Sequence, residues 1–152
     1  MNKYSIEDVL PHRDPMILID SLESYDSDSC ICQVTITKAS PFYDDKLTGV
    51  PSYIGSEYMA QAIAAFAGAN ALDNKDKVTI GFLLGSRKYK TFKPAFLLNT
   101  SLTIKIKELY QEESGLSVFE CEIIDQTQSL IAQANINVFQ PEDAEAFINA
   151  SH

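Results

Sequence analysis

The sequence PSYIGSEYMAQAIAAFAG, residues 51–68, decides the fold of this chain because its apolar residues leave no wide polar face. Such a segment is typical of a helix that other elements enclose, rather than of a helix that lies on a surface. Ser52, just after Pro51, is suited to cap the start of the helix, and Asp73 and Asn74 mark its expected end. The chain is therefore predicted to be organised around one long buried helix.

Glu57 is the one carboxylate in this stretch, and Gln61 follows four residues later on the same helix face. Apolar surroundings penalise the ionised form of a carboxyl group, which is how proteins keep an acid able to donate a proton near neutral pH. We therefore interpret Glu57 as a buried acid that shares a polar pocket with Gln61. The pattern leaves a second interpretation open, in which Glu57 is hydrogen-bonded or reaches the surface.

Length and composition are those of an ordinary single domain. The chain has 152 residues, of which 45% are hydrophobic, which gives room for one sizeable core. We predict one domain over residues 1–152, with 141–152 as a short terminal helix or tail. No run approaches the roughly 20 apolar residues of a membrane span, and the amino terminus lacks the apolar centre of a secretory signal. We therefore expect a cytoplasmic protein.

Charge and metal-binding residues exclude two classes of function. A net charge of −9 argues against a nucleic-acid surface, which would need a basic field. Half of the 12 basic residues nevertheless lie within residues 87–107, where they form either a docking patch for an acidic partner or a solvated strand face. The three cysteines show no CxxC spacing and the only histidines are His12 and His152, so we predict no metal site.

Alternating apolar and polar residues predict several strands around the helix. The predicted strands are residues 16–25, 30–37, 79–87, 102–107, 119–123 and 132–138. Residues 111–115 and 125–128 are expected to form hairpin turns between them. One long apolar helix with amphipathic strands predicts an α+β fold, in which an antiparallel sheet wraps around the helix.

Three segments of the chain together resemble a known family. LPHRDPMILID at residues 10–20, PSYIGSEYMAQA at 51–62 and RKYKTFKPAFLLNTSL at 87–102 resemble FabA/FabZ-type 3-hydroxyacyl-acyl-carrier-protein dehydratases, which have the hot-dog fold. The second segment is similar to that family's PGxxxxEAMAQ helix motif, and the third to its ARFKRPVxPGD segment. The combination of PHRxPM, EYMAQA and GFLLGxR is similar to the dehydratase-like proteins encoded in bacterial aryl-polyene clusters. The resemblance covers nearly the whole chain.

The resemblance implies a reaction and a set of partners. The substrate would be a 3-hydroxyacyl chain held as a thioester on the phosphopantetheine of acyl carrier protein, and the product a 2-enoyl thioester for fatty-acid or aryl-polyene synthesis. No further cofactor is implied. The assembly would be a homodimer, or a heterodimer with a related hot-dog protein, with sites between the subunits. A histidine would act as base and the helix carboxyl group as acid, while backbone amides at the helix start would stabilise the enolate oxygen.

Carrying these roles over to this sequence leaves a gap at the base. Glu57 matches the family's catalytic carboxylate, and Pro51 and Ser52 match its Pro-Gly at the helix start, with serine in place of glycine. The family's GHFPG histidine has no counterpart, since residues 41–57 read PFYDDKLTGVPSYIGSE. His12 is therefore the predicted base. The alternative is that His12 fixes its own loop by hydrogen bonding.

The remaining candidates come from the same motifs. Tyr43 and Asp44 are weaker candidates for the base, because an exposed aspartate is a poor base for this proton. Arg87 binds a carboxylate or phosphate, or else forms a salt bridge at a strand end. The residues predicted to bind substrate are Pro51, Ser52, Tyr53, Gln61 and Arg87.

Two classes of function follow from the sequence. The first is an active dehydratase with Glu57 as acid and His12 as base. The second is a catalytically incomplete hot-dog subunit that binds acyl carrier protein or pairs with an active dehydratase. The missing GHFPG histidine favours the second class, whereas the presence of His12 together with Glu57 favours the first. An acyl thioesterase is a weaker third possibility, because hot-dog thioesterases also use a helix carboxylate.

Overall fold

The central helix is present in the structure, a computed structural model that describes residues 4–11, 16–76 and 82–139, with only the backbone described at 82–87. Helix α2 (Gly55–Asp73) follows a single 3-10 turn, η1 (Ser52–Ile54). It ends at Asn74, as predicted. Ser52 does not cap α2 directly, because the 3-10 turn comes between them and Ile54 occupies the capping position.

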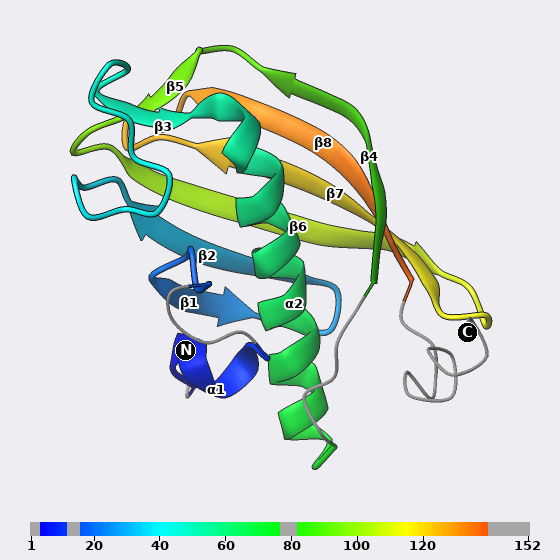
Figure 1. Cartoon of the computed structure of the whole chain (residues 1–152). Coiled ribbons are helices and arrows are strands. Elements are labelled where there is room, and N and C mark those ends of the chain that lie inside the picture. Colours follow the sequence, from blue (N-terminus) through cyan, green and yellow to red (C-terminus); the bar gives the residue numbers. More distant parts are fainter. Residues whose placement is uncertain (1–3, 12–15, 77–81, 140–152) are drawn as a thin grey trace, which may run out of the picture.

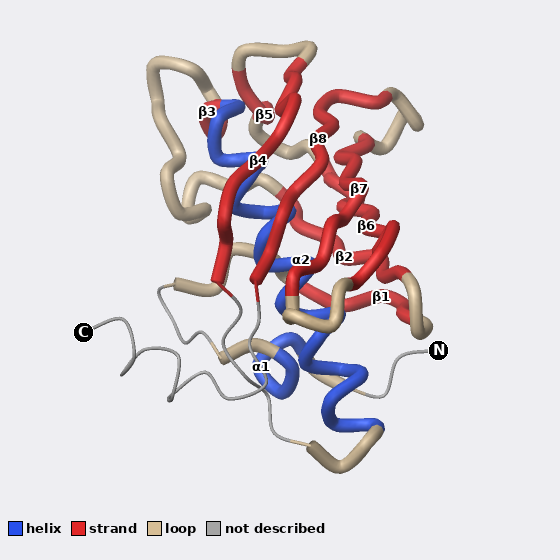
Figure 2. The backbone as a smooth tube through the Cα atoms, turned by 90° about the vertical axis from the view of Figure 1, so that its right-hand side faces the viewer, coloured by secondary structure: helices blue, strands red, loops and turns tan. Residues whose placement is uncertain are grey.

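A six-stranded antiparallel sheet curls around α2, which lies in its hollow (Figures 1 and 2). The order of strands is β1-β2-β6-β7-β8-β4, so β1 and β4 are the edges. The strands are β1 (Ser21–Tyr25), β2 (Ser29–Thr35), β4 (Phe82–Thr91), β6 (Ser101–Gln111), β7 (Leu116–Ile124) and β8 (Leu130–Phe139). This arrangement confirms the predicted α+β hot-dog fold.

All six predicted strands are found, with bounds that differ from the predicted ones, and the differences at β1 and β4 bear on the site. The strand expected at residues 16–25 begins only at Ser21, because the backbone amide of Leu18 donates to the Gln61 side chain instead of to a neighbouring strand. The strand expected at 79–87 is β4, which continues to Thr91. Both predicted hairpin turns are confirmed, and Gly115 lies in the first with a φ of 98°. The terminal helix expected at 141–152 lies outside the described residues.

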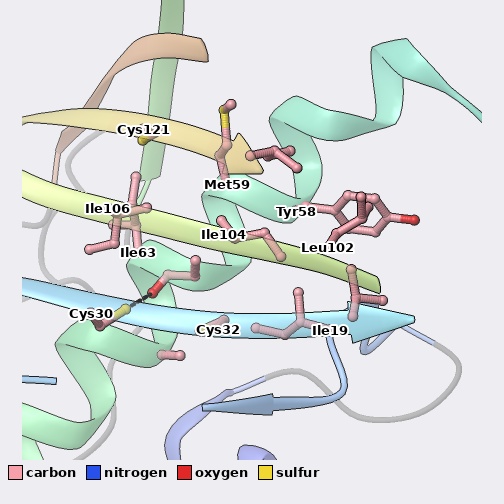
Figure 3. Packing of buried hydrophobic residues seen from close by; sticks show 14 of the residues in the cluster. Ile19, Cys30, Cys32, Tyr58, Met59, Ile63, Leu102, Ile104, Ile106 and Cys121 are labelled. Carbon is pink, nitrogen blue, oxygen red and sulfur yellow. Dashed lines mark hydrogen bonds between the residues drawn. The ribbon is translucent and has the colours of Figure 1, made fainter. Parts of the chain in front are cut away.

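The core fills the space between the sheet and α2 (Figure 3). Side chains from β2, β6 and β7 meet apolar side chains of the helix there. Those labelled in Figure 3 are Ile19, Cys30, Cys32, Tyr58, Met59, Ile63, Leu102, Ile104, Ile106 and Cys121. The three cysteines are buried, and the thiol of Cys30 donates to the Ala62 carbonyl over 3.3 Å. Burial raises the pKa of the Cys121 thiol, which keeps it protonated and unreactive.

The outer face of the sheet carries charges of both signs. Lys105 and Lys107 on β6 are exposed, as the alternating pattern predicted. They lie opposite Glu122 and Glu120 of β7 in the strand register. Opposite charges directly across a strand pair are favourable. These two lysines therefore belong to a solvated, charge-balanced sheet face.

A short helix, α1 (Ile6–Val9), packs against α2 (Figure 1). The close approach needs Gly68 of α2, because a Cβ at that position would overlap the carbonyl group of Val9. No helix among the described residues combines the length and the apolar character needed to cross a membrane.

Candidate active site

A second, smaller sheet delivers the chain to the start of α2. It pairs β3 (Gly49–Pro51) with β5 (Ala95–Leu97), and Pro51 lies opposite Ala95. The backbone amide of Ser52 then donates to the Pro94 carbonyl over 3.1 Å. In Figure 1 this sheet and the loop before it gather at the end of the molecule where α2 begins. The helix start is thus held by backbone contacts to a distant segment of the chain.

Glu57 lies in the first turn of α2 and is exposed. The prediction that this chain buries Glu57 is therefore wrong, and the surface interpretation left open by the sequence holds. The reason is rotation about the helix axis, since the next residues, Tyr58 and Met59, point into the core and are at most 1% exposed. Among the described residues Glu57 makes no hydrogen bond or ion pair. The positive end of the helix dipole favours a carboxylate at this position.

Gln61 is only 6% exposed, and both ends of its amide contact the backbone of the segment that precedes β1. Its nitrogen donates to the Met16 carbonyl over 2.5 Å, and its oxygen accepts from the Leu18 amide over 2.8 Å. The predicted polar pocket shared with Glu57 is therefore wrong, because both ends of the amide are already engaged. Gln61 instead fixes residues 16–18 against α2, one helical turn beyond Glu57.

The predicted base cannot be placed. His12 lies outside the described residues, as does His152, so the described part of the chain contains no imidazole. Both flanks of residues 12–15 lie against α2, since Val9 contacts Gly68 and Met16 is bound by Gln61. The assignment of His12 as base stays a prediction.

Asp44, one of the two weaker candidates for the base, has a structural role in its loop. Its side chain accepts a hydrogen bond from the Lys46 amide over 2.8 Å, and its backbone bridges to Gly49. Tyr43 is half-buried against the core. Neither observation gives either residue a position beside Glu57.

The predicted substrate-binding residues divide into three groups. Tyr53 is 63% exposed and Pro51 and Ser52 are half-buried, so these three and Glu57 form a surface around the start of α2. Arg87 lies on β4 opposite Asn135 of β8, and only its backbone is described. Gln61, as described above, binds the backbone of its own chain.

The sequence did not single out Tyr89, which contacts the helix start. Its hydroxyl group donates to the Ser52 carbonyl over 2.5 Å, and its ring is half-buried against the core. The available signal was the order Lys88-Tyr89-Lys90, because alternation in a strand places a residue between two exposed lysines on the inner face.

An antiparallel sheet curled around a helix with a carboxylate in its first turn places this chain among the hot-dog proteins. The family model for ApeP-like proteins, described as ApeP dehydratase, matches residues 4–149, and the chain belongs to this family. A solved structure, the dehydratase heterocomplex ApeI:P from Xenorhabdus doucetiae, contains a chain that superposes with a TM-score of 0.89 at 28% identity. That match covers 99% of this chain and 100% of the other.

Two sequence relatives are 3-hydroxyacyl-[acyl-carrier-protein] dehydratases named FabZ. The protein from Chlamydia trachomatis serovar L2 is 34% identical over 94 residues, which cover 59% of this chain and 61% of that protein. The match therefore spans about three fifths of the Chlamydia relative. The protein from Clostridium perfringens strain SM101 is 30% identical over 109 residues, which cover 70% of this chain and 76% of that protein.

Proposed function

We propose that this protein is a subunit of a 3-hydroxyacyl-acyl-carrier-protein dehydratase, in which Glu57 is the acid. The observation that carries the proposal is the position of Glu57 in the exposed first turn of α2, beside the backbone amides of the helix start. Membership of the ApeP-like dehydratase family and the matches to FabZ proteins support this class of reaction.

The reaction requires three groups to act at one place. A base removes a proton from the carbon next to the thioester carbonyl, and the electron pair of that C–H bond forms the new C=C bond. The hydroxyl group leaves as water after taking a proton from Glu57. Amides at the positive end of α2 stabilise the charge that develops on the carbonyl oxygen. His12 is the proposed base from this chain.

Exposure of Glu57 favours a site that a second subunit completes. Acid–base chemistry gains from a site closed to water, because electrostatic interactions are stronger there. Among the described residues the sheet covers other faces of α2 and leaves Glu57 exposed, so none of them supplies this cover. We infer a heterodimer with a related hot-dog protein. The similar chain of known structure belongs to the dehydratase heterocomplex ApeI:P. In this arrangement the partner covers Glu57, and a homodimer is the other outcome to be tested.

We further propose that the acyl chain arrives on acyl carrier protein in the cytoplasm, so that its phosphopantetheine arm is the only prosthetic group involved. Not all of the basic window at residues 87–107 is available for docking. Lys88 and Lys90 line a hollow on the outer sheet face together with Glu120 and Glu122, the two glutamates that also lie opposite Lys107 and Lys105. Lys93, between β4 and β5, is exposed and is the cation that we propose for docking, and its charge also acts on the nearby Asp125.

The test is turnover of a 3-hydroxyacyl-acyl-carrier-protein by the complex of this chain with its hot-dog partner. Glu57→Gln should lower enoyl formation at least about 100-fold, the usual scale for loss of a general acid. Glu113→Gln, which alters an exposed glutamate in the β6–β7 turn, is the matched control and should leave the rate unchanged. A Glu57→Gln complex with the wild-type rate would refute the proposal.

Two further variants of the assay separate the alternatives. His12→Ala should abolish turnover if this chain supplies the base, whereas full activity would assign the base to the partner. Release of free thiol, without any enoyl product, would instead identify a thioesterase. Activity of the isolated chain equal to that of the complex would remove the need for a partner.

A further inference from the structure

We propose that Tyr89 is a positioning residue that holds the start of α2, and with it Glu57, in the geometry needed for proton transfer. The inference rests on the proposed function, in which the helix start is the reacting surface. It concerns a residue on β4, an edge strand of the main sheet and distant in sequence from the helix.

The contact is made at the turn that begins the helix. The Tyr89 hydroxyl donates to the Ser52 carbonyl, which also accepts the backbone N–H of Gly55. Gly55 is required for this contact, because a Cβ on it would overlap the Tyr89 hydroxyl group. The first residue of α2 therefore packs directly on the hydroxyl that fixes the preceding turn.

A bulge in β4 lies at the position of Tyr89. Arg87 pairs with Asn135 and Lys90 with Gln133, so β4 has one more residue than β8 between these pairs. Lys88, inside the bulge, has a φ of 57°, a backbone region that few residues other than glycine adopt. Such bulges redirect side chains and are frequent beside active sites.

The hydroxyl group is a dependable donor at neutral pH. Burial raises the pKa of Tyr89 to about 12. The hydroxyl group therefore keeps the proton that it donates to Ser52 at physiological pH and at pH values well above it. Glu57 follows Gly55 by two residues, within the same turn of the helix. A shift of the Ser52 turn would move both the carboxyl group and the neighbouring amides relative to the substrate.

The decisive comparison uses two tyrosines that hold opposite ends of α2. Tyr89→Phe removes the hydroxyl at the start of the helix and keeps the ring. Tyr25→Phe removes a hydroxyl that donates to Asp73, the last residue of the helix, over 2.7 Å. Each variant loses one hydrogen bond at an end of α2, to η1 in one case and to Asp73 in the other, so a merely structural role predicts the same result for both.

We expect Tyr89→Phe to lower kcat of the complex about tenfold with KM within about twofold, because displacement of a catalytic group acts on the chemical step. Tyr25→Phe should keep the wild-type kcat. Hydrogen exchange should become faster at the amides of residues 55–58 in Tyr89→Phe, and unchanged there in Tyr25→Phe.

Equal kcat values for Tyr89→Phe and the wild type, or equal losses in both variants, would overturn the inference. Hydrogen exchange makes the result independent of the proposed reaction. If the wild-type complex forms no enoyl product, the proposed function fails, and unchanged exchange at residues 55–58 in Tyr89→Phe would separately refute the contact as a positioning device.

Discussion

Helix α2 carries a carboxylate at each end, and the two are treated in opposite ways. Asp73, the last residue of the helix, accepts hydrogen bonds of 2.7 Å from the hydroxyl groups of both Tyr4 and Tyr25. Those two rings stack with their centroids 6.2 Å apart. Glu57, in the first turn, has no such partner among the described residues. Among the described residues, the same functional group is therefore hydrogen-bonded at one end of α2 and exposed without such a bond at the other.

The helix dipole explains why the carboxylate of Asp73 needs hydrogen-bond donors and that of Glu57 does not. A carboxylate is unfavourable near the carboxyl end of a helix and favourable near the amino end. Two tyrosine hydroxyls offset the cost at Asp73 and tie the helix to the amino-terminal segment and β1 in the process. Glu57 lies where the dipole favours its charge, and among the described residues it forms no hydrogen bond or ion pair that would stabilise the fold. The proposed role of Glu57 is therefore chemical rather than structural.

The largest expected effect separates the two carboxylates by their function. Glu57→Gln should lower dehydration by the complex at least about 100-fold. It should also leave the free energy of unfolding within about 0.5 kcal/mol of wild type, because the side chain is exposed. Steady-state kinetics and urea denaturation of the same preparation measure both quantities. A 100-fold change in rate corresponds to about 2.7 kcal/mol. A loss of that size in the free energy of unfolding would show that Glu57 is a structural residue.

The next largest effect is expected for a substitution of Gln61, near the start of the helix, and it concerns the free energy of unfolding. Gln61→Leu replaces the amide by an apolar group of similar size, which leaves the Leu18 amide and the Met16 carbonyl without the partners that Gln61 supplies. Each buried group left unsatisfied costs about 1–3 kcal/mol, so we expect a loss of about 2–4 kcal/mol in urea denaturation.

Gln33→Leu is the matched control for Gln61. The Gln33 amide makes one contact, of 3.3 Å, to the Thr103 hydroxyl of the neighbouring strand. That variant should lose less than about 1 kcal/mol. Equal losses in the two variants would show that Gln61 does not anchor residues 16–18.

Asp73→Asn should weaken the carboxyl end of the helix alone. The asparagine keeps one acceptor oxygen but cannot accept from both tyrosines, so we expect a loss of about 1 kcal/mol. Turnover by the complex should be unchanged, in contrast to Glu57→Gln. A drop in kcat would show that the two ends of α2 are coupled.

The smallest effect is a dependence of stability on alkaline pH. Burial and the neighbouring Asp73 raise the pKa of Tyr25 to about 12, above the value near 10 of a tyrosine in an unfolded chain. The unfolded chain therefore loses this proton first, so the contribution of Tyr25 to stability is complete below pH 10 and is lost as pH rises toward 12. Denaturation across that interval should show a shallower fall for Tyr25→Phe than for wild type. Parallel curves would contradict the contact.

The sequence predicted the elements whose burial follows a simple period. The alternating residues of β2, β6, β7 and β8 face the core as expected, and α2 ends where Asp73 and Asn74 indicated. These predictions succeed because one side of each strand packs on the helix and the other side meets water.

The exposure of Glu57 was not predictable for an equally physical reason. Ala60, Ala64 and Ala67 continue the helix face that Glu57 begins, and they are only half-buried. Alanine counts as apolar in a sequence pattern whether or not the sheet covers it. The pattern therefore predicted that α2 is enclosed on every side. The order Lys88-Tyr89-Lys90 predicts that Tyr89 faces inward, but its contact with Ser52 was not predictable, because the contact lies at a bulge in β4 that no residue pattern indicates.

Labelling of carboxylates with a carbodiimide and an amine, read by mass spectrometry, tests the central claim most directly. That claim is that Glu57 belongs to a surface which a second hot-dog subunit covers. In the isolated chain Glu57 and Asp73 should both be labelled, and in the complex Glu57 should be protected about tenfold or more while Asp73 is unchanged. Equal labelling of Glu57 with and without the partner would contradict the account.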